Sequence, residues 1–216
     1  MGKMNLHFDI LNGKRSSIVS RLLHFHDRFY LAGGTGLALQ LGHRISEDFD
    51  FFTSSNFNND ALLGEINKLF YEYSVSVIQN EKDTLTVLLN DEIKISFFKL
   101  NYVNVLPLLE AGSFKLAQIQ EIGIMKLLAL PRALYKDYVD LYFILKEHSL
   151  SALIDLAKLK HPDFNPSIYL KCLLSYEDVD LLPVIFTIGK AITETEVFNF
   201  LEKQTLEFLK VTGGKV

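Results

Sequence analysis

The spacing of apolar residues changes near residue 105, and this change constrains the fold more than any other feature of the sequence. Before it, short β-prone runs alternate with polar turns, over residues 48–52, 73–78, 84–89 and 93–98. After it, apolar residues recur at helical spacing, over residues 118–130, 137–146, 151–160, 166–174 and 194–210. The pattern predicts an α+β protein with a mixed sheet and flanking helices in residues 1–105, followed by a helical domain in residues 106–216.

Composition excludes several classes of protein. The 216 residues are 49% hydrophobic and 22% charged, which is enough apolar material for a packed core and excludes a disordered chain. The net charge of −4 argues against a broad nucleic-acid-binding surface. A single cysteine, Cys172, cannot form an internal disulfide, and no apolar run approaches the roughly 20 residues of a membrane-spanning helix. We therefore expect a cytoplasmic protein with no membrane partner.

A glycine cluster, Gly33-Gly34-Thr35-Gly36, separates a short apolar run from residues with helical spacing. Glycines let backbone N–H groups approach a ligand closely, and a helix N-terminus favours negative charge, so this junction suits a phosphate. The hydroxyl of Thr35 would either cap the helix or bond a phosphate oxygen. The alternative is a tight turn with no ligand. The cluster matches neither the dinucleotide-binding nor the P-loop pattern.

Asp48 and Asp50 are two residues apart in a run that alternates polar and apolar positions. In a strand such residues project from the same face, so the two carboxylates repel each other unless a cation lies between them. Mg²⁺ accepts carboxylate oxygens and keeps positions open for substrate phosphates. The alternative is a solvated edge strand. Together with the glycine cluster, the aspartates predict one site for a nucleoside triphosphate (NTP) and its metal ion.

The segment 30–52, YLAGGTGLALQLGHRISEDFDFF, resembles the AbiEii/AbiGii nucleotidyltransferase-like toxin family, which is related to DNA polymerase β. A second stretch supports the resemblance: QEIGIMKLLAL at 120–130, then Arg132 and KDYVDLY at 136–142. The resemblance implies a nucleotidyltransferase fold and Mg²⁺- or Mn²⁺-dependent transfer of a nucleotide from an NTP to an acceptor, with RNA such as tRNA as the candidate. It also implies a toxin of a toxin–antitoxin or phage-defence pair, and hence an antitoxin partner.

The resemblance further implies that the helical domain contributes Lys126 and Asp137 to the active cleft, with Lys126 on phosphate and Asp137 on substrate or acting as a base. From the residues alone, Lys126 would otherwise reach solvent at the edge of an apolar helix, and Asp137 would cap its helix. Asp140 would then pair with Lys136 or Arg132. Arg44 would either bind phosphate or complement the dipole of the preceding helix.

Ser96 occupies the position where this fold usually has a third carboxylate on a later strand. Glu92 lies on the same face but about two strand steps away, too far to replace that acid. Either Asp137 takes the role of the base, or the protein binds nucleotide and transfers it poorly. The alternative function is therefore a catalytically weakened, nucleotide-binding regulatory module. His24 and His26 have no third ligand nearby, and we expect them to be solvated or capping residues.

Overall fold

The computed structural model describes residues 6–111 and 114–213, and the chain forms two compact units, residues 1–118 and 119–216. The first contains a mixed sheet and the second is helical, as the sequence predicts. The boundary lies later than residue 105 because strands β6 (Leu109–Ala111) and β7 (Phe114–Leu116) belong to the sheet of the first unit. Strands this short cannot carry a recognisable period-two pattern.

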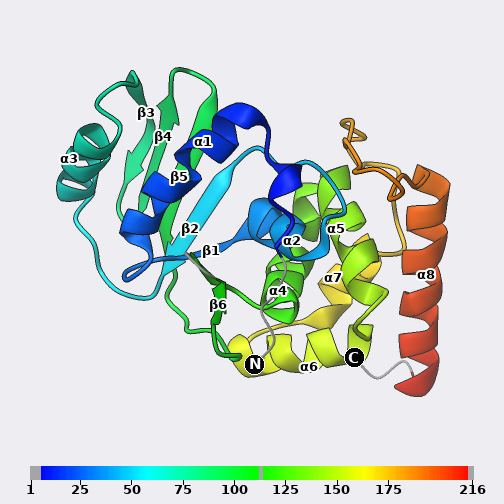
Figure 1. Cartoon of the computed structure of the whole chain (residues 1–216). Coiled ribbons are helices and arrows are strands. Elements are labelled where there is room, and N and C mark those ends of the chain that lie inside the picture. Colours follow the sequence, from blue (N-terminus) through cyan, green and yellow to red (C-terminus); the bar gives the residue numbers. More distant parts are fainter. Residues whose placement is uncertain (1–5, 112–113, 214–216) are drawn as a thin grey trace. The chain divides into compact units, whose positions relative to one another are not determined.

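Seven strands of the first unit form one sheet in the order β3-β4-β5-β2-β1-β7-β6 (Figure 1). Besides β6 and β7, the sheet contains β1 (Tyr30–Ala32), β2 (Phe49–Thr53), β3 (Val75–Glu81), β4 (Thr84–Leu89) and β5 (Ile93–Lys99). Strand β2 lies in the interior of the sheet, antiparallel to β1 and parallel to β5. The alternative of a solvated edge strand for the aspartate segment is therefore wrong. Strands β4 and β5 form the hairpin that their β-prone runs predict.

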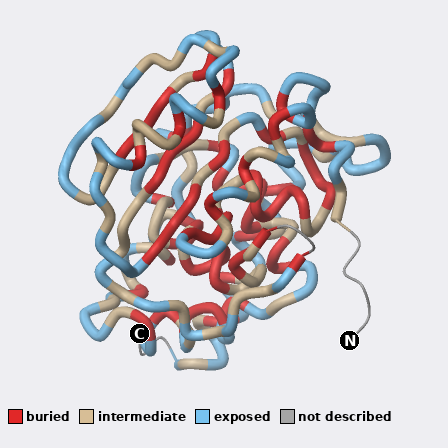
Figure 2. Tube along the Cα trace, turned by 60° about the vertical axis from the view of Figure 1, so that its left-hand side comes forward, coloured by how far each residue is buried: buried red, intermediate tan, exposed pale blue. Residues whose placement is uncertain are grey.

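One face of this sheet carries the apolar core of the first unit. Helices α1 (Gly13–Leu22) and α3 (Asn59–Leu69) contribute Ile18 and Ile66 to the same cluster as Phe51 of β2 and Phe97 of β5. Figure 2 colours such buried stretches red and the exposed turns pale blue. Because side chains alternate along a strand, the opposite face of β2 and β5 receives polar residues, among them Asp50 and Ser96, as well as Phe52 and Phe98.

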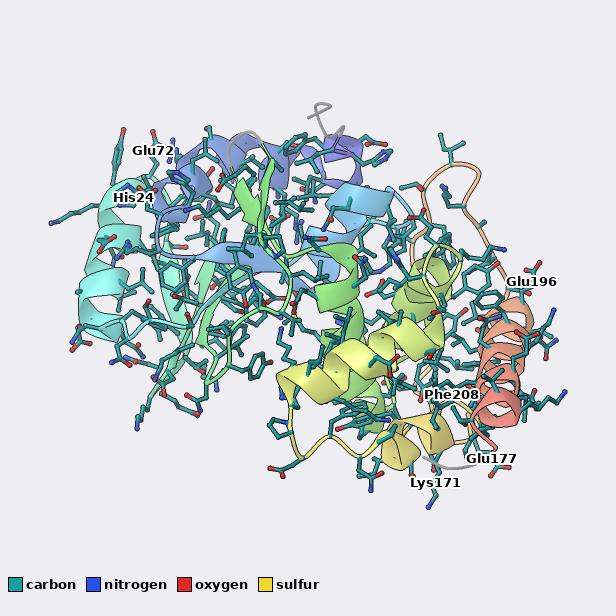
Figure 3. All side chains as sticks on the ribbon, turned by 90° about the horizontal axis from the view of Figure 1, so that it is seen from below. His24, Glu72, Lys171, Glu177, Glu196 and Phe208 are labelled. Atoms are coloured by element: carbon teal, nitrogen blue, oxygen red, sulfur yellow. The ribbon has the colours of Figure 1, made fainter. Side chains whose placement is uncertain are left out.

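Over residues 119–213, the second unit contains five α-helices joined by turns and a short 3₁₀ helix, η3 (Leu130–Arg132). The helices are α4 (Ile119–Ala129), α5 (Tyr135–Leu145), α6 (Leu150–Lys160), α7 (Pro166–Cys172) and α8 (Glu194–Val211). Glu196, labelled in Figure 3, forms a capping box with Thr193 at the start of α8. In the described part of the chain, no helix is both long and apolar enough to cross a membrane.

We predict that Phe97→Ala lowers the free energy of unfolding of the protein by about 3–5 kcal/mol, because it leaves a cavity in the core. The Phe97 ring is fully buried, and its centroid lies 5.0 Å from those of Phe25 and Phe29. Val77→Ala on the exposed side of β3 is the control and should change the stability little. Urea titrations of both variants test this, and similar losses would contradict the assigned core.

Candidate functional site

The glycine cluster forms the junction between β1 and helix α2 (Gly33–Leu41). Gly33 has a φ of +61°, and a Cβ atom there would lie 2.7 Å from Oδ2 of Asp50. A Cβ on Gly34 would lie 2.6 Å from Nη2 of Arg44. The absence of side chains at both positions thus lets Asp50 and Arg44 lie against the turn. Because the first N–H groups of a helix have no intrahelical acceptors, the turn offers donors beside the Asp50 carboxylate.

Thr35 fixes this turn to the segment that precedes β2. Its side chain is 1% exposed, and its hydroxyl donates to the backbone carbonyl of Asp48 and lies 2.8 Å from Oγ of Ser46. The N-cap of α2 is Ala32, and no side chain caps the helix, so the alternative in which the Thr35 hydroxyl caps α2 is wrong. The Thr35 hydroxyl is already engaged in hydrogen bonds within the first unit. Thr35 can therefore contribute its backbone N–H, rather than its hydroxyl, to a phosphate site.

Arg44 is buried and lies at the N-terminal end of α2. Its Nη1 donates to the carbonyl of Ile45 at 3.0 Å, and its Nη2 lies beside Gly34. Helix α2 ends at Leu41, with Gly42 in the left-handed conformation as its C-cap. The alternative in which Arg44 complements the C-terminal dipole of this helix is therefore wrong. Its guanidinium instead adds positive charge where a phosphate would bind the turn.

Asp48 and Asp50 project from the same face of the sheet, as their alternation predicts. The parallel pairing of β2 with β5 places Asp50 opposite Ser96. Asp48, immediately before β2, has its Oδ2 2.7 Å from Nζ of Lys94. Lys94 and Ser96 are two residues apart in β5 and so share a face, which the two aspartates share with them. About a third of the Asp48 side chain remains exposed.

The position expected for a third carboxylate holds a hydroxyl pair. Ser96 is 2% exposed, and its Oγ lies 3.3 Å from Oγ1 of Thr86 on β4. The Glu92 carboxylate is bound to Lys14 of α1 at 2.5 Å and does not replace the missing acid. Lys94 was not among the residues predicted from the sequence. Its strand was predicted, but the register that brings it to Asp48 comes from pairing two strands far apart in the chain.

These residues fit one divalent cation. Among residues 6–111 and 114–213, no three or more His, Cys, Asp or Glu side chains converge into a metal-binding group. Asp48 and Asp50 supply carboxylate oxygens, and Asp48 already holds a positive partner, Lys94. Mg²⁺ is commonly held by one or two carboxylates, with substrate phosphates and waters completing its shell. The donor set therefore suits a metal ion that arrives with a nucleotide.

In the second unit, Lys126 forms the centre of a buried ionic network. Its Nζ lies 2.7 Å from Oδ1 of Asp137 and 2.6 Å from Oδ2 of Asp140, and Nη2 of Arg132 lies 2.8 Å from the other oxygen of Asp137. Both aspartates are fully buried, and Lys126 is 8% exposed. The alternatives in which Lys126 reaches solvent, Asp137 caps α5 and Asp140 pairs with Lys136 or Arg132 are therefore wrong.

Helix α5, which carries both aspartates of this network, also carries two buried tyrosines, Tyr135 and Tyr138. Burial raises the pKa of Tyr135 to about 12, and the negative charge of Glu194 adds to the effect. Burial also raises the pKa of Tyr138 to about 12, with smaller contributions from Cys172 and Asp137. Both phenols are therefore protonated near neutral pH, and neither acts as a base.

A pocket of about 360 Å³ in the first unit lies at the opposite end of β1 and β2 from the glycine turn. Its lining includes Tyr30, Thr53 and Lys115, but none of the site residues predicted from the sequence. His26 also lines this pocket, whereas His24 lies in the 3₁₀ helix η2 (Leu23–Phe25), with Nε2 3.3 Å from Glu65 (Figure 3). Both histidine side chains are partly exposed, and His26 is the C-cap residue of η2.

Comparison with known proteins identifies the family. The model of the family described as "Nucleotidyl transferase AbiEii toxin, Type IV TA system" matches residues 18–187. The chain belongs to the AbiEii nucleotidyltransferase toxin family. An uncharacterized protein of Aquifex aeolicus (strain VF5) is 40% identical over 162 residues, which are 69% of this chain and 74% of that protein.

Two solved structures have the same fold as this AbiEii family member. The protein JHP933 from Helicobacter pylori aligns with a TM-score of 0.60 and 20% identity, covering 97% of this chain and 96% of its own. A candidate nucleotidyltransferase from H. pylori aligns with a TM-score of 0.57 and 21% identity, covering 90% and 91%. These similarities confirm the expected nucleotidyltransferase fold.

We predict that Gly33→Ala destabilises this AbiEii family member more than Gly189→Ala does. Both glycines have positive φ, +61° and +77°, so alanine costs about 1–2 kcal/mol of backbone strain at either position. Only Gly33→Ala also forces a Cβ against Asp50, because Gly189 has no atom within 4 Å of the new Cβ. The additional loss should be about 1–3 kcal/mol. Urea titration of the two variants measures the difference, and equal losses would contradict the contact with Asp50.

We also predict that Lys126→Met lowers the free energy of unfolding by about 3–5 kcal/mol, because it leaves two buried carboxylates without their shared cation. Lys136→Met, on the exposed side of α5, removes the same charge and should leave the stability nearly unchanged. If thermal melting shows both variants to be equally stable, the network does not hold the unit together.

Proposed function

We propose that this chain is a divalent-metal-dependent nucleotidyltransferase that moves a nucleotide from an NTP to an acceptor, with RNA such as tRNA as the candidate acceptor. The observation that carries the proposal is the position of the Asp50 carboxylate against Gly33, the first residue of α2. A carboxylate favours a cation, and the N-terminal N–H groups of a helix favour phosphate. A metal-bound triphosphate satisfies both at once.

The residues of the glycine turn and the two aspartates near it have distinct roles in the proposal. Asp48 and Asp50 hold Mg²⁺ or Mn²⁺, which neutralises charge on the phosphates when bound. The backbone N–H groups of Gly33, Gly34 and Thr35 bind phosphate oxygens. Catalysis in such a site is mainly positioning and charge stabilisation, because phosphoryl chemistry requires little else from the protein.

In this proposal, Arg44 supplies positive charge to the phosphate site although its side chain is buried. Its guanidinium is buried beneath the glycine turn, and one of its N–H groups is held by the carbonyl of Ile45. A guanidinium fixed in this way stabilises negative charge on the turn without having to reorganise when nucleotide binds.

For Lys126 and Asp137 the proposal keeps the roles that the family resemblance implies. Lys126 neutralises phosphate, and Asp137 contacts the substrate or takes the proton of the attacking acceptor group. A buried ionic network costs desolvation energy that well-packed apolar residues would avoid. The three buried charges of this network, on Lys126, Asp137 and Asp140, therefore favour a role beyond stability.

The family description names a toxin of a type IV toxin–antitoxin system. We extend this to the chain itself: it acts as a toxin or phage-defence effector in the cytoplasm, opposed by an antitoxin. The alternative, a catalytically weakened nucleotide-binding regulatory module, is favoured by one observation, the hydroxyl of Ser96 opposite Asp50 where a carboxylate would stand.

We predict that Asp50→Asn lowers label transfer from radiolabelled NTPs to total RNA by at least about 100-fold, because it removes a metal-binding charge. Asp48→Ala should have a similar effect. Asp60→Asn, on the exposed first turn of α3, is the matched control and should retain transfer. Thermal melting of each variant separates loss of function from loss of fold.

Three results of this experiment have different consequences. Transfer that is lost in Asp50→Asn and retained in Asp60→Asn supports the enzyme. Metal-dependent NTP binding by the unmodified protein, with no transfer to RNA, supports the regulatory module. Normal turnover in Asp50→Asn would remove this residue from the site.

A further inference from the structure

Strand β5 places a different side chain beside each aspartate of the site. Its parallel pairing with β2 aligns Ser96 with Asp50, and Lys94, two residues earlier, lies against Asp48 with a separation of 2.7 Å between Nζ and Oδ2. Lys94 is 39% exposed, so its ammonium is held by Asp48 and also reaches solvent. The hydroxyl of Ser96, by contrast, is buried against Thr86.

This arrangement limits how many metal ions the site can hold. Two divalent ions about 3.5–4 Å apart carry four positive charges and are normally bridged by several carboxylates. On this face, β2 and the residue before it present the carboxylates of Asp50 and Asp48, and the Asp48 carboxylate is paired with the ammonium of Lys94. The residue of β5 that pairs with Asp50 is Ser96, whose hydroxyl lies against that of Thr86, and neither hydroxyl carries a charge.

We infer that Lys94 is a nucleotide-binding residue whose ammonium supplies the positive charge that a second metal ion would otherwise supply, so that the site works with a single divalent cation. The inference rests on the proposed nucleotidyltransferase function. A lysine suits this role because its ammonium is a compact charge with three donors on a flexible stem. It pairs with Asp48 in the free protein and turns to the phosphates when the metal–nucleotide complex engages that carboxylate.

The same strand provides a matched control. Lys99 also belongs to β5 and also pairs with an aspartate, at 3.5 Å from Oδ1 of Asp83. It is five residues from Lys94, and because this spacing is odd it projects from the other face of the sheet. Lys99→Met therefore removes the same charge and the same kind of ion pair from β5 while leaving the glycine-turn face intact.

The test combines nucleotide affinity with a count of bound metal. Non-hydrolysable analogues of the four common NTPs are titrated with Mn²⁺ into the full chain and into Lys94→Met, Lys94→Arg and Lys99→Met. Electron paramagnetic resonance counts the Mn²⁺ bound at equimolar protein and analogue. We expect one Mn²⁺ per chain. The analogue should bind Lys94→Met about 10-fold more weakly than the unmodified protein, which is consistent with the loss of one charge-assisted hydrogen bond. Its affinity for Lys94→Arg and Lys99→Met should stay within about 3-fold of that for the unmodified protein.

The outcomes separate this inference from the function on which it rests. Two Mn²⁺ bound by the unmodified protein, or unchanged affinity in Lys94→Met, overturns the role of Lys94. If the role of Lys94 is overturned in this way but Asp50→Asn abolishes binding in the same assay, the nucleotidyltransferase proposal still stands. If Asp50→Asn also binds normally, the proposed function fails, and the role of Lys94 fails with it. Equal weakening in Lys94→Met and Lys99→Met shows a general charge effect and likewise overturns the inference.

Discussion

The hydrogen-bonded pairing of β2 with a strand on each side is the constraint on which the candidate site depends. The antiparallel pairing with β1 sets Ala32 opposite Asp50, so the chain leaves the sheet into α2 right beside that carboxylate. The parallel pairing with β5 sets Ser96 opposite the same residue. A one-residue shift in either register would turn the aspartates towards the apolar core, and burial of two carboxylates there would be prohibitively unfavourable. The packing of the core face therefore fixes the chemistry of the polar face.

The polar residues of this region serve two different purposes. Thr35 and Arg44 are buried. The Thr35 hydroxyl donates to the carbonyl of Asp48 and so holds the segment before β2 against the start of α2, whereas Arg44 donates to the carbonyl of Ile45 within the loop after α2. Asp48 and Lys94 remain partly exposed and can exchange partners. The donors that are fixed in place suit electrostatic stabilisation, because preorganised donors need not move during the reaction.

Much of the first unit could be predicted from the sequence because its signals are local. The alternation around Asp50 specifies a strand, and the glycines before residue 37 specify a close approach of backbone. What could not be predicted depends on contacts between distant segments. Nothing near Lys94 in the sequence indicates that it meets Asp48. Helical spacing suggested Lys136 or Arg132 as the partner of Asp140, whereas the actual partner, Lys126, lies on another helix. The strands β6 and β7, of three residues each, were missed because they are too short to show a period.

The separation of β2 from β5 along the chain also has a kinetic consequence. Lys94 and Asp48 are 46 residues apart, and the helix α3 and the strands β3 and β4 lie between them. Contacts of such high sequence separation form after a large loop has been closed, and they slow folding relative to local helical contacts. During synthesis, a ribosome releases the glycine turn and both aspartates well before it releases β5. A nascent chain therefore presents both aspartates before Lys94 has been synthesised, and the Lys94–Asp48 ion pair forms only when β5 joins the sheet beside β2.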